Sequence, residues 1–421
     1  MTQRMRTTLD LPTVLPEWAT DAGAIVEPDL TDKRTGWVAG TKPPARWMNW
    51  VLNALTGFAQ TAASAIIGTW SEHDPTASFV DKISFTHYHP ALGLWVGYNG
   101  VDDSHYYSED GFKYIDSGNS DEGGSIYVSG KDSSRLIISS LGVTTGGLIY
   151  TTDGINYNAQ PSGPTAYTPY GLDTKYPDSD FCVTVGSGVT NALIGIAPNV
   201  ITAWVAPTGT FPTIPNADLA TDSLRWLHGT TWILLTKPGN TYVSTDDCDN
   251  WAVTAEVPED VTSAAISTYS CIGYNPDSNR VIVGGFDGTS TYSLQPEIVY
   301  SDDAGTSWTP AALATSILSD APMTVGTDYW RCSFVYYCGG GMWIFGGERK
   351  DREATSTPWL SASFDDGETW VPINLPFTEG IGGIEPLHPS CDGRHLVLTM
   401  DRTASNHTLI HSNSMAATAR Q

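Results

Sequence analysis

Basic side chains are scarce in this sequence. Its 421 residues carry 21 Lys and Arg against 46 Asp and Glu, which gives a formal net charge of −25. The phosphates of a nucleic acid would be repelled over most of such a surface. We therefore predict that nucleic acid is not a partner, and that any binding to an anionic cell envelope is local and specific.

Long hydrophobic runs are missing as well. No apolar stretch approaches the roughly 20 residues that a bilayer-spanning helix needs. Residues 1–20 also contain no hydrophobic segment of the kind found in secretory signals. We predict no membrane insertion, and synthesis in a cytoplasm.

Cysteine pairs with short spacing are also absent. The six cysteines are Cys182, Cys248, Cys271, Cys332, Cys338 and Cys391, and none forms a Cys-x-x-Cys motif. We interpret them as mostly buried, reduced, small hydrophobic residues. His87 and His89 alternate onto one strand face, but no third ligand can be identified. The acidic loops at 102–103 and 178–180 lack the glycine and terminal glutamate of an EF-hand, so the sequence predicts no metal and no cofactor.

What the sequence does contain is glycine, tryptophan and a recurring turn motif. With 41 Gly and 15 Trp, the composition is typical of a turn-rich, all-β protein. The motif Ser/Thr-x-Asp-x-Gly-x-Thr/Ser-Trp is complete at 301–308 and 363–370. Weaker copies lie at 108–114, 151–157 and 244–251, the last with Cys248 in place of glycine. We call these five segments the repeat turns.

The spacing of the repeat turns predicts a repeated structural unit. They begin at residues 108, 151, 244, 301 and 363, so successive starts lie 43, 93, 57 and 62 residues apart. Repeats of about 40 to 50 residues with short strands are typical of propeller blades, and the step of 93 leaves room for a unit whose motif is lost. Runs of residues typical of β-strands indicate about seven blades, a number within the usual range for propellers. The predicted blades span residues 83–108, 125–151, 165–215, 224–251, 267–308, 329–370 and 384–412.

Each repeat turn has the chemistry of a hairpin corner. Ser, Thr and Asp side chains accept hydrogen bonds from backbone N–H groups, glycine supplies a positive φ, and Trp or Tyr packs back on the sheet. The motif resembles the Asp-box, or bacterial neuraminidase, repeat. This resemblance implies an Asp-box β-propeller with the turns between the third and fourth strands of its blades. It assigns structural rather than chemical roles to Asp110, Asp153, Asp246, Asp303, Asp365, Trp251, Trp308 and Trp370.

The propeller is expected to span residues 68–421 and to close on itself. The last predicted unit, 384–412, ends with little chain left for a fourth strand, whereas Gly68-Thr69-Trp70-Ser71 resembles the missing half of a repeat turn. We predict that residues near Trp70 supply the outer strand of the last blade. That pairing would remove an exposed sheet edge.

Residues 1–67 form a separate predicted domain. Prolines and glycines break residues 1–42 too often for a core. Apolar residues then recur at three- and four-residue steps from Ala45 to Ile67, and Pro43 and Pro44 stand where a helix start tolerates them. We predict a short docking segment with one α-helix. Its wide apolar stripe favours a homo-oligomer, with a trimer as one option.

The same domain carries a second resemblance. Residues 15–20 and 36–53 contain Gly-Trp, Gly-x-x-Pro-Pro-Ala and Asn-Trp-x-x-Asn elements, and they look like the N-terminal segment of phage tail-fibre and tail-appendage proteins. The resemblance implies a bacteriophage virion protein of the tail or an appendage, whose N-terminus docks on tail or connector proteins. It assigns docking to Trp37, Pro43, Pro44, Trp47, Asn49, Trp50 and Asn53.

Long connections late in the chain suggest a binding surface. We predict insertions between second and third strands at 286–295 and 348–359, and long links between units at 311–328 and 372–383. Loops on one face of a rigid scaffold are common binding sites, and Arg beside aromatic residues can recognise a host-surface glycan by stacking and charge. The candidate residues are Tyr292, Tyr329, Arg349, Lys350, Arg352 and Trp359. In the alternative interpretation, the charges of 348–353 only form solvated local ion pairs.

A glycoside hydrolase is the alternative function, either sialidase-like or a depolymerase of host polysaccharide. Sialidases share the Asp-box and use an arginine clamp, a Tyr nucleophile with its Glu, and an Asp. Inner-strand positions offer Asp222, Arg225, Arg331 and Glu385, but no Arg-Ile-Pro-like string precedes the first repeat turn. We therefore predict a binding or structural protein with no catalytic residues. The sequence does not identify the host or the receptor.

Overall fold

The computed structural model divides the chain into two compact units, Met1–Ile67 and Gly68–Gln421. The residues it describes all belong to the second unit. The predicted helix at 45–67 and the predicted docking residues, from Trp37 to Asn53, lie outside them. The structure describes residues 70–72, 85–89, 92–99, 104–111, 113–120, 126–129, 136–140, 148–159, 168–175, 181–188, 191–197, 205–254, 256–257, 268–289, 292–313, 329–350, 356–373, 385–391, 396–403 and 406–412.

The second unit is all-β, as predicted. Its described part contains five four-stranded sheets, together with one sheet of three strands and one of five. The 3₁₀ turn η3 (Asn216–Asp218) is the one helical element among the described residues. Four of the four-stranded sheets are β2 (Phe85–His89) to β5 (Ile115–Ser120), β6 (Ile126–Ser129) to β9 (Tyr157–Ala159), β13 (Leu219–His228) to β16 (Ala252–Val253), and β17 (Thr268–Asn275) to β20 (Thr309–Pro310).

Inside these sheets the strands follow one another in chain order and pair antiparallel, so each sheet is a meander. Their inner members are β3 (Leu94–Asn99), β4 (Ser104–Ser108), β7 (Leu136–Ser140), β8 (Leu148–Thr151), β14 (Thr231–Thr236), β15 (Thr241–Ser244), β18 (Arg280–Thr289) and β19 (Tyr292–Ser301). The three-stranded sheet comprises β10 (Thr168–Thr174), β11 (Cys182–Ser187) and β12 (Ala192–Ala197).

The five-stranded sheet adds a strand from a linking segment to a meander. The meander comprises β22 (Tyr329–Gly339), β23 (Met342–Lys350), β24 (Ser356–Ser363) and β25 (Thr369–Ile373). β21 (Ala312–Leu313) follows the preceding sheet and pairs parallel with β25. Part of the predicted link at 311–328 therefore joins the edge of the next sheet, which helps to tie the two sheets together.

The fifth four-stranded sheet joins the two ends of the second unit. It comprises β26 (Glu385–Cys391), β27 (Leu396–Thr403), β28 (Asn406–Ser412) and β1 (Trp70–Glu72). β1 pairs antiparallel with β28, with Trp70 opposite Ser412 and Glu72 opposite Ile410. The predicted closure is confirmed: a segment from the start of the unit completes the last sheet and covers its outer edge.

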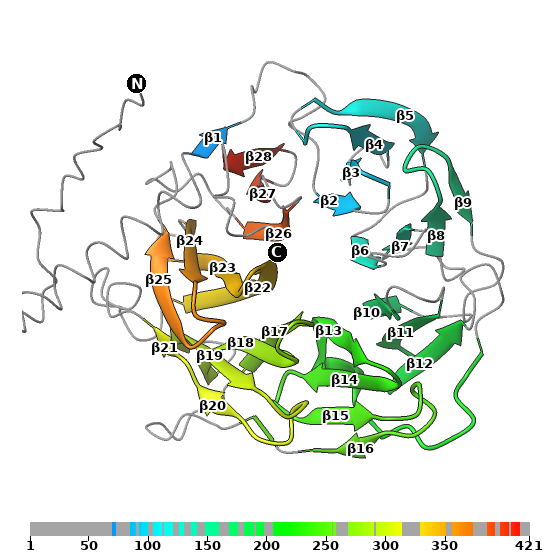
Figure 1. Ribbon diagram of the computed structural model, residues 1–421, viewed down its shortest axis with the longest axis vertical. Coiled ribbons are helices and arrows are strands. Elements are labelled where there is room, and N and C mark those ends of the chain that lie inside the picture. Colours follow the sequence, from blue (N-terminus) through cyan, green and yellow to red (C-terminus); the bar gives the residue numbers. More distant parts are fainter. Residues whose placement is uncertain are drawn as a thin grey trace, which may run out of the picture. The chain divides into compact units, whose positions relative to one another are not determined.

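The sheets pack face to face as the blades of a β-propeller (Figure 1). The first strands β10, β13, β17, β22 and β26 contact one another in succession. Because side chains alternate along a strand, each sheet contributes to two core clusters. On β14, Trp232 and Leu234 belong to the cluster shared with β10–β12, whereas Ile233 and Leu235 belong to the one shared with β17–β20.

Two predicted insertions are strands rather than loops. β18 and β19 stay paired as far as Thr289 opposite Tyr292, and β23 and β24 as far as Lys350 opposite Ser356. The predictions of loops at 286–295 and 348–359 were therefore wrong over most of their lengths. The physical reason is that the two segments of each connection are of similar length. They extend the antiparallel pairing of their strands, which satisfies the backbone N–H and C=O groups of both segments.

Candidate functional site

The repeat turns are held by hydrogen bonds between their own side chains and backbone. In the turn between β24 and β25, the Ser363 hydroxyl donates to Asp365 Oδ1 over 2.8 Å and accepts from the backbone N–H of Gly367 over 2.8 Å. Asp365 in turn accepts from the backbone N–H of Thr369 at 2.9 Å and from its hydroxyl at 2.6 Å. The indole of Trp370 donates to the Gly367 carbonyl and is 1% exposed.

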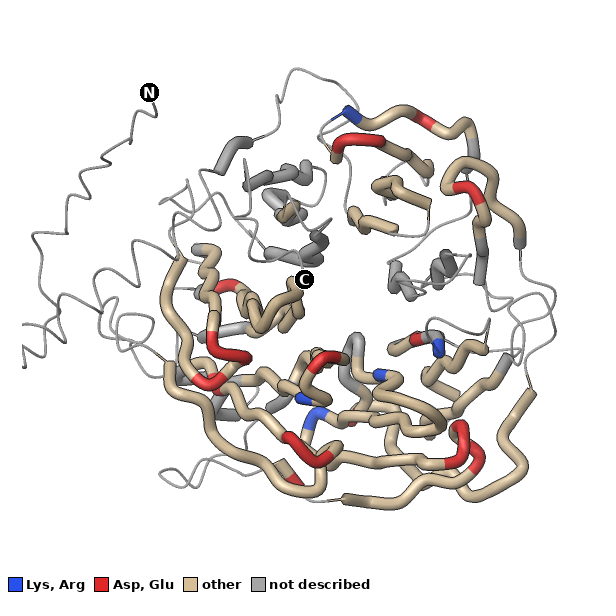
Figure 2. The backbone as a smooth tube through the Cα atoms, in the orientation of Figure 1, with Lys and Arg blue, Asp and Glu red and all other residues tan. Residues whose placement is uncertain are grey.

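The same bonds recur in the other repeat turns. Asp110, Asp153, Asp246 and Asp303 each accept from the Ser or Thr two residues earlier. Each also accepts from a backbone N–H three or four residues later. All five turns connect the third and fourth strands of a meander. The predicted hairpin-corner chemistry is confirmed, and Figure 2 shows the acidic residues at these turns.

The motif tryptophans pack over their turns. The indole of Trp251 donates to the Cys248 carbonyl at 3.1 Å, as Trp370 does in its own turn. Trp308 is half-buried against the core cluster between β13–β16 and β17–β20. These rings therefore cover the corners and are part of the core.

The hydrogen bonds shift the acidity of the turn carboxyls. Burial alone would raise the pKa of Asp153, but bonds from Asn156 and its neighbours in the turn lower it to about 2. The pKa values of Asp303 and Asp365 are lowered for the same reason, since their hydrogen bonds outweigh the effect of burial. Bonds from Asn250 lower the pKa of Asp246. Carboxyls with a depressed pKa stay ionised at neutral pH, which suits a turn-holding role and not that of a general acid.

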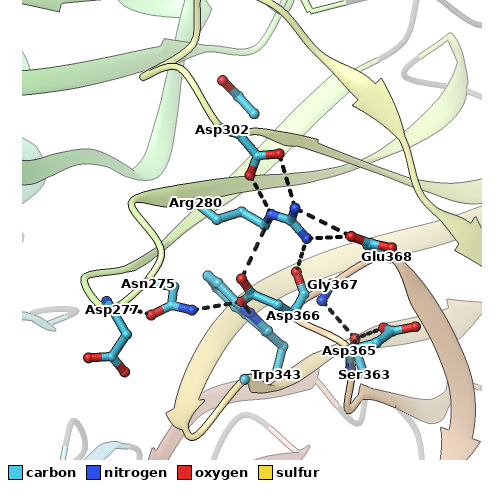
Figure 3. A network of polar contacts seen from close by, with 12 residues as sticks. Asn275, Asp277, Arg280, Asp302, Trp343, Ser363, Asp365, Asp366, Gly367 and Glu368 are labelled. Atoms are coloured by element: carbon cyan, nitrogen blue, oxygen red, sulfur yellow. Dashed lines mark hydrogen bonds and ion pairs between the residues drawn. The ribbon is translucent and has the colours of Figure 1, made fainter.

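An arginine connects two repeat turns of neighbouring sheets (Figure 3). Arg280, at the start of β18, forms a bidentate pair with Asp302 at 2.6 and 3.0 Å, within its own sheet. Its Nη1 also donates to the backbone carbonyl of Asp366 at 2.7 Å and lies 3.4 Å from Glu368 Oε1, both in the next sheet. The guanidinium lies 4.3 Å from the centre of the Tyr300 ring. One cation therefore holds the corners of two sheets.

The fourth position of the repeat turn takes part in this connection. Asp366 has a left-handed φ of 58° and accepts from the Trp343 indole at 2.8 Å and from Asn275 Nδ2 at 2.7 Å. A second seam shows a related arrangement. Asp247, with a φ of 57°, bonds Lys175 of the preceding sheet at 2.9 Å.

Sequence reasoning missed these two connections between sheets. A signal was present, because the two turns carry aspartate at the fourth position, where the turn at 301–308 has Ala304. Each turn also belongs to a sheet whose second strand has a tryptophan as its second residue, Trp232 or Trp343. The Trp232 indole nitrogen lies 3.4 Å from Asp247 Oδ1.

The predicted binding residues that the structure describes lie on β19, β22, β23 and β24. Tyr329 is opposite Lys350 on the β22–β23 ladder, and Tyr292 is opposite Thr289 at the end of β18–β19. Arg349 is opposite Trp330, a neighbour that the prediction did not include. Trp359 is half-buried and packs edge-on against Phe345, with ring centres 4.9 Å apart, so it also belongs to the core. Arg352 lies outside the described residues.

The candidates for the hydrolase alternative lie on the first strands of their sheets. Asp222 and Arg225 are on β13, Arg331 is on β22 and Glu385 is on β26. Arg225 Nη1 donates to the Leu224 carbonyl at 2.7 Å. Among the described residues, the structure contains no group of three or more His, Cys, Asp or Glu arranged to hold a metal ion. No helix in the described ranges is long and apolar enough to cross a membrane.

Comparisons with known proteins support the fold class. No protein-family model matches the chain, and no curated protein matches it in sequence. Its structure is similar to that of YCF48 from Cyanidioschyzon merolae, at 13% identity and a TM-score of 0.50 over 82% of this chain and 98% of that one. It is also similar to a streptogramin B lyase, at 10% identity and a TM-score of 0.52 over 82% and 97%.

A third similar structure is virginiamycin B lyase from Staphylococcus aureus, at 11% identity and a TM-score of 0.51 over 81% and 98% of the two chains. Identities this low define a class of protein and nothing finer. The class is the β-propellers, and within it function is carried by sites rather than by the fold.

Proposed function

We propose that this protein is a bacteriophage tail fibre or appendage. It docks on tail or connector proteins through residues 1–67 and presents a β-propeller to glycans of the host surface. The N-terminal resemblance supports the virion location. The observation that carries the binding function is a pair of long hairpins on neighbouring sheets, which project from one end of the propeller.

The hairpins extend the sheets on the side opposite the repeat turns. In an antiparallel meander, the connection from second to third strand opens at the end opposite the connection from third to fourth. β18 and β19 have 10 residues each, whereas β14 and β15 of the preceding sheet have 6 and 4. Four extra residues add about 13 Å of strand. β23 and β24, with 9 and 8 residues, extend beside them.

The residue types at these positions suit an anionic glycan. Lys350 and Arg349 are opposite Tyr329 and Trp330 on the ladder, so two cations and two aromatic residues share four neighbouring positions. Aromatic rings stack on sugar faces, and guanidinium groups pair with carboxylates or phosphates. Because the whole protein carries a net charge of −25, a local cationic site would select anionic groups that the remaining surface repels.

We further propose that all seven sheets are blades of one closed ring and that the repeat turns are Asp boxes. In this interpretation two blades depart from the four-stranded pattern: β10–β12 with three strands and β21–β25 with five. The position of the turns between third and fourth strands supports this reading. The sheet β10–β12 lies between the repeat turns that begin at residues 151 and 244 and has no repeat turn of its own. This explains why these two turns start 93 residues apart.

High-resolution imaging of purified phage particles tests the location. We expect density for residues 1–67 against tail or connector proteins, with the propeller pointing outward and the subunit copy number visible directly. Absence of the chain from particles would overturn the virion proposal.

Binding to immobilised polysaccharide from the host tests the second part. The double variant Arg349→Ala/Lys350→Ala is expected to lose binding by tenfold or more. The control Lys237→Ala removes a cation from the corresponding, shorter connection of β14–β15 and should bind normally. Equal binding by both variants would contradict the assignment. Release of reducing sugar by the wild-type protein would favour the glycoside hydrolase instead.

A further inference from the structure

Two thiols from neighbouring sheets meet the same stretch of β18. Cys271 on β17 and Cys332 on β22 are 1% and 2% exposed and belong to one core cluster. The Cys271 thiol donates to the carbonyl of Gly284 at 3.5 Å, and the Cys332 thiol to that of Gly285 at 2.6 Å. These carbonyls belong to adjacent residues of β18, and Cys332 is close enough to Cys271 for the two thiols to interact electrostatically.

The surrounding backbone allows this close approach. A Cβ atom on Gly284 would lie 2.9 Å from the Cys271 sulfur and 2.5 Å from the Phe345 ring, so only glycine leaves the space that the thiol occupies. Ser270, next to Cys271, donates its hydroxyl to the Cys332 carbonyl at 2.6 Å. That bond holds β17 and β22 together at the position of the two cysteines.

We propose that Cys271 and Cys332 are a disulfide-forming pair that links the sheet β17–β20 covalently to the sheet β22–β25 when the protein meets an oxidant. The proposal concerns the propeller alone and holds whether or not the protein belongs to a virion. The other described cysteines offer no comparable pair across a seam: Cys248, for example, belongs to the cluster between β10–β12 and β13–β16. All five described cysteines are buried, and none of them forms a disulfide in the structure.

The reaction is ordinary thiol–disulfide exchange with a low-molecular-weight disulfide such as oxidised glutathione. One cysteine thiolate attacks a glutathione sulfur, releases one reduced glutathione and forms a mixed disulfide. The second cysteine then attacks the protein sulfur and releases the other glutathione. Two S–H bonds are lost, one S–S bond forms, and the oxidant takes up two electrons and two protons.

Burial sets the rate of this step. It raises the pKa of the Cys332 thiol well above its usual range, and the neighbouring Cys271 thiol adds to the shift. The thiolate is the attacking species, so oxidation requires a transient opening of the seam and becomes faster at higher pH. Once formed, the bond would be shielded from reductants by the same burial.

The test uses the purified full-length protein incubated with oxidised glutathione at pH 8.5. After remaining thiols are blocked and the chain is digested with trypsin, we expect fragments 226–280 and 332–349 to be joined. These fragments also contain Cys248 and Cys338, so fragmentation spectra must place the bond between Cys271 and Cys332. Oxidation should also raise the thermal midpoint by roughly 5 °C, because the bond closes a loop of about 60 residues.

Matched variants separate this pair from other cysteines. Cys271→Ala and Cys332→Ala should each abolish the joined fragments and the thermal shift, whereas Cys338→Ala should keep both. The mass assignment on the wild-type protein does not depend on the folding of any variant. The proposal would be overturned if the two fragments stay separate after incubation with oxidised glutathione. It would also be overturned if the bond involves Cys248 or Cys338 instead.

Discussion

Arg280 donates a hydrogen bond to the backbone carbonyl of Asp366, a residue 86 positions later in the chain and in the next sheet of the propeller. The same guanidinium pairs with Asp302 in its own sheet. A propeller depends on contacts between sheets, and its polar corners need connections that hydrophobic packing does not provide. This arginine provides one of them at the seam between β17–β20 and β22–β25.

Replacing Arg280 should loosen that seam. Its side chain is only 10% exposed and donates to the Asp366 backbone carbonyl, so Arg280→Ala would remove buried packing and deprive that carbonyl of this donor. We expect the free energy of unfolding to fall by about 2 kcal/mol. Denaturant unfolding followed by tryptophan fluorescence measures the change. Lys113→Ala, which removes an exposed cation in another repeat turn, should change stability by less than about 0.5 kcal/mol.

Replacing Gly367 should be more damaging than replacing a glycine in open space. Gly367 has a φ of +89°, and an added Cβ would lie 2.1 Å from Ile282 Cδ1. Gly93 also has a positive φ, +64°, but no atom within 4 Å of the added Cβ. We expect Gly93→Ala to cost about 1 kcal/mol from backbone strain alone, and Gly367→Ala about 3 kcal/mol. Equal losses of stability would show that the clash with Ile282 is relieved without cost.

Removing β1 should open the propeller. We expect a chain that begins at residue 68 to keep the propeller's thermal midpoint, so that residues 68–421 unfold at nearly the same temperature alone as in the full-length protein. A chain that begins at residue 74 lacks the strand that pairs with β28 and leaves that edge exposed. Its thermal midpoint should fall and its tendency to aggregate should rise, as differential scanning calorimetry and light scattering would show. Identical behaviour of the two truncated chains would contradict a closing role for β1.

Acid should destabilise the repeat turns in a defined pH range. The pKa of Asp153 is lowered to about 2 in the folded protein, from an ordinary value of 3.8. A depressed folded-state pKa contributes stability that is fully present above pH 4 and is lost as the pH falls towards 2. Asp246, Asp303 and Asp365 act in the same direction.

The thermal midpoint should therefore drop between pH 4 and pH 2. Asp365→Asn removes one of these titrating groups, so its stability at pH 7 should be lower and its pH dependence shallower than in the wild-type protein. Parallel pH profiles of the two proteins would mean that Asp365 does not contribute to the acid transition.

Much of the fold could be predicted because its signals are local. A repeat turn satisfies its own backbone within eight residues, from Ser363 to Trp370, so the motif alone defines the corner. The closure by β1 could be inferred for a similar reason: the last sheet lacked a strand and residues 68–71 resembled half of a repeat turn. The long hairpins could not be distinguished from loops by sequence alone, because strand pairing depends on the register between two separate segments.

The sequence by itself determined the corners, the strand-and-turn spacing and the acidic surface, since each depends on residues close together in the chain. Only the tertiary structure decided which side chains meet across the seams. Arg280 with Asp366, Lys175 with Asp247, and Cys271 with Cys332 are separated by tens of residues. No local pattern encodes such contacts, because they depend on how neighbouring sheets pack and on the glycines that let their backbones approach.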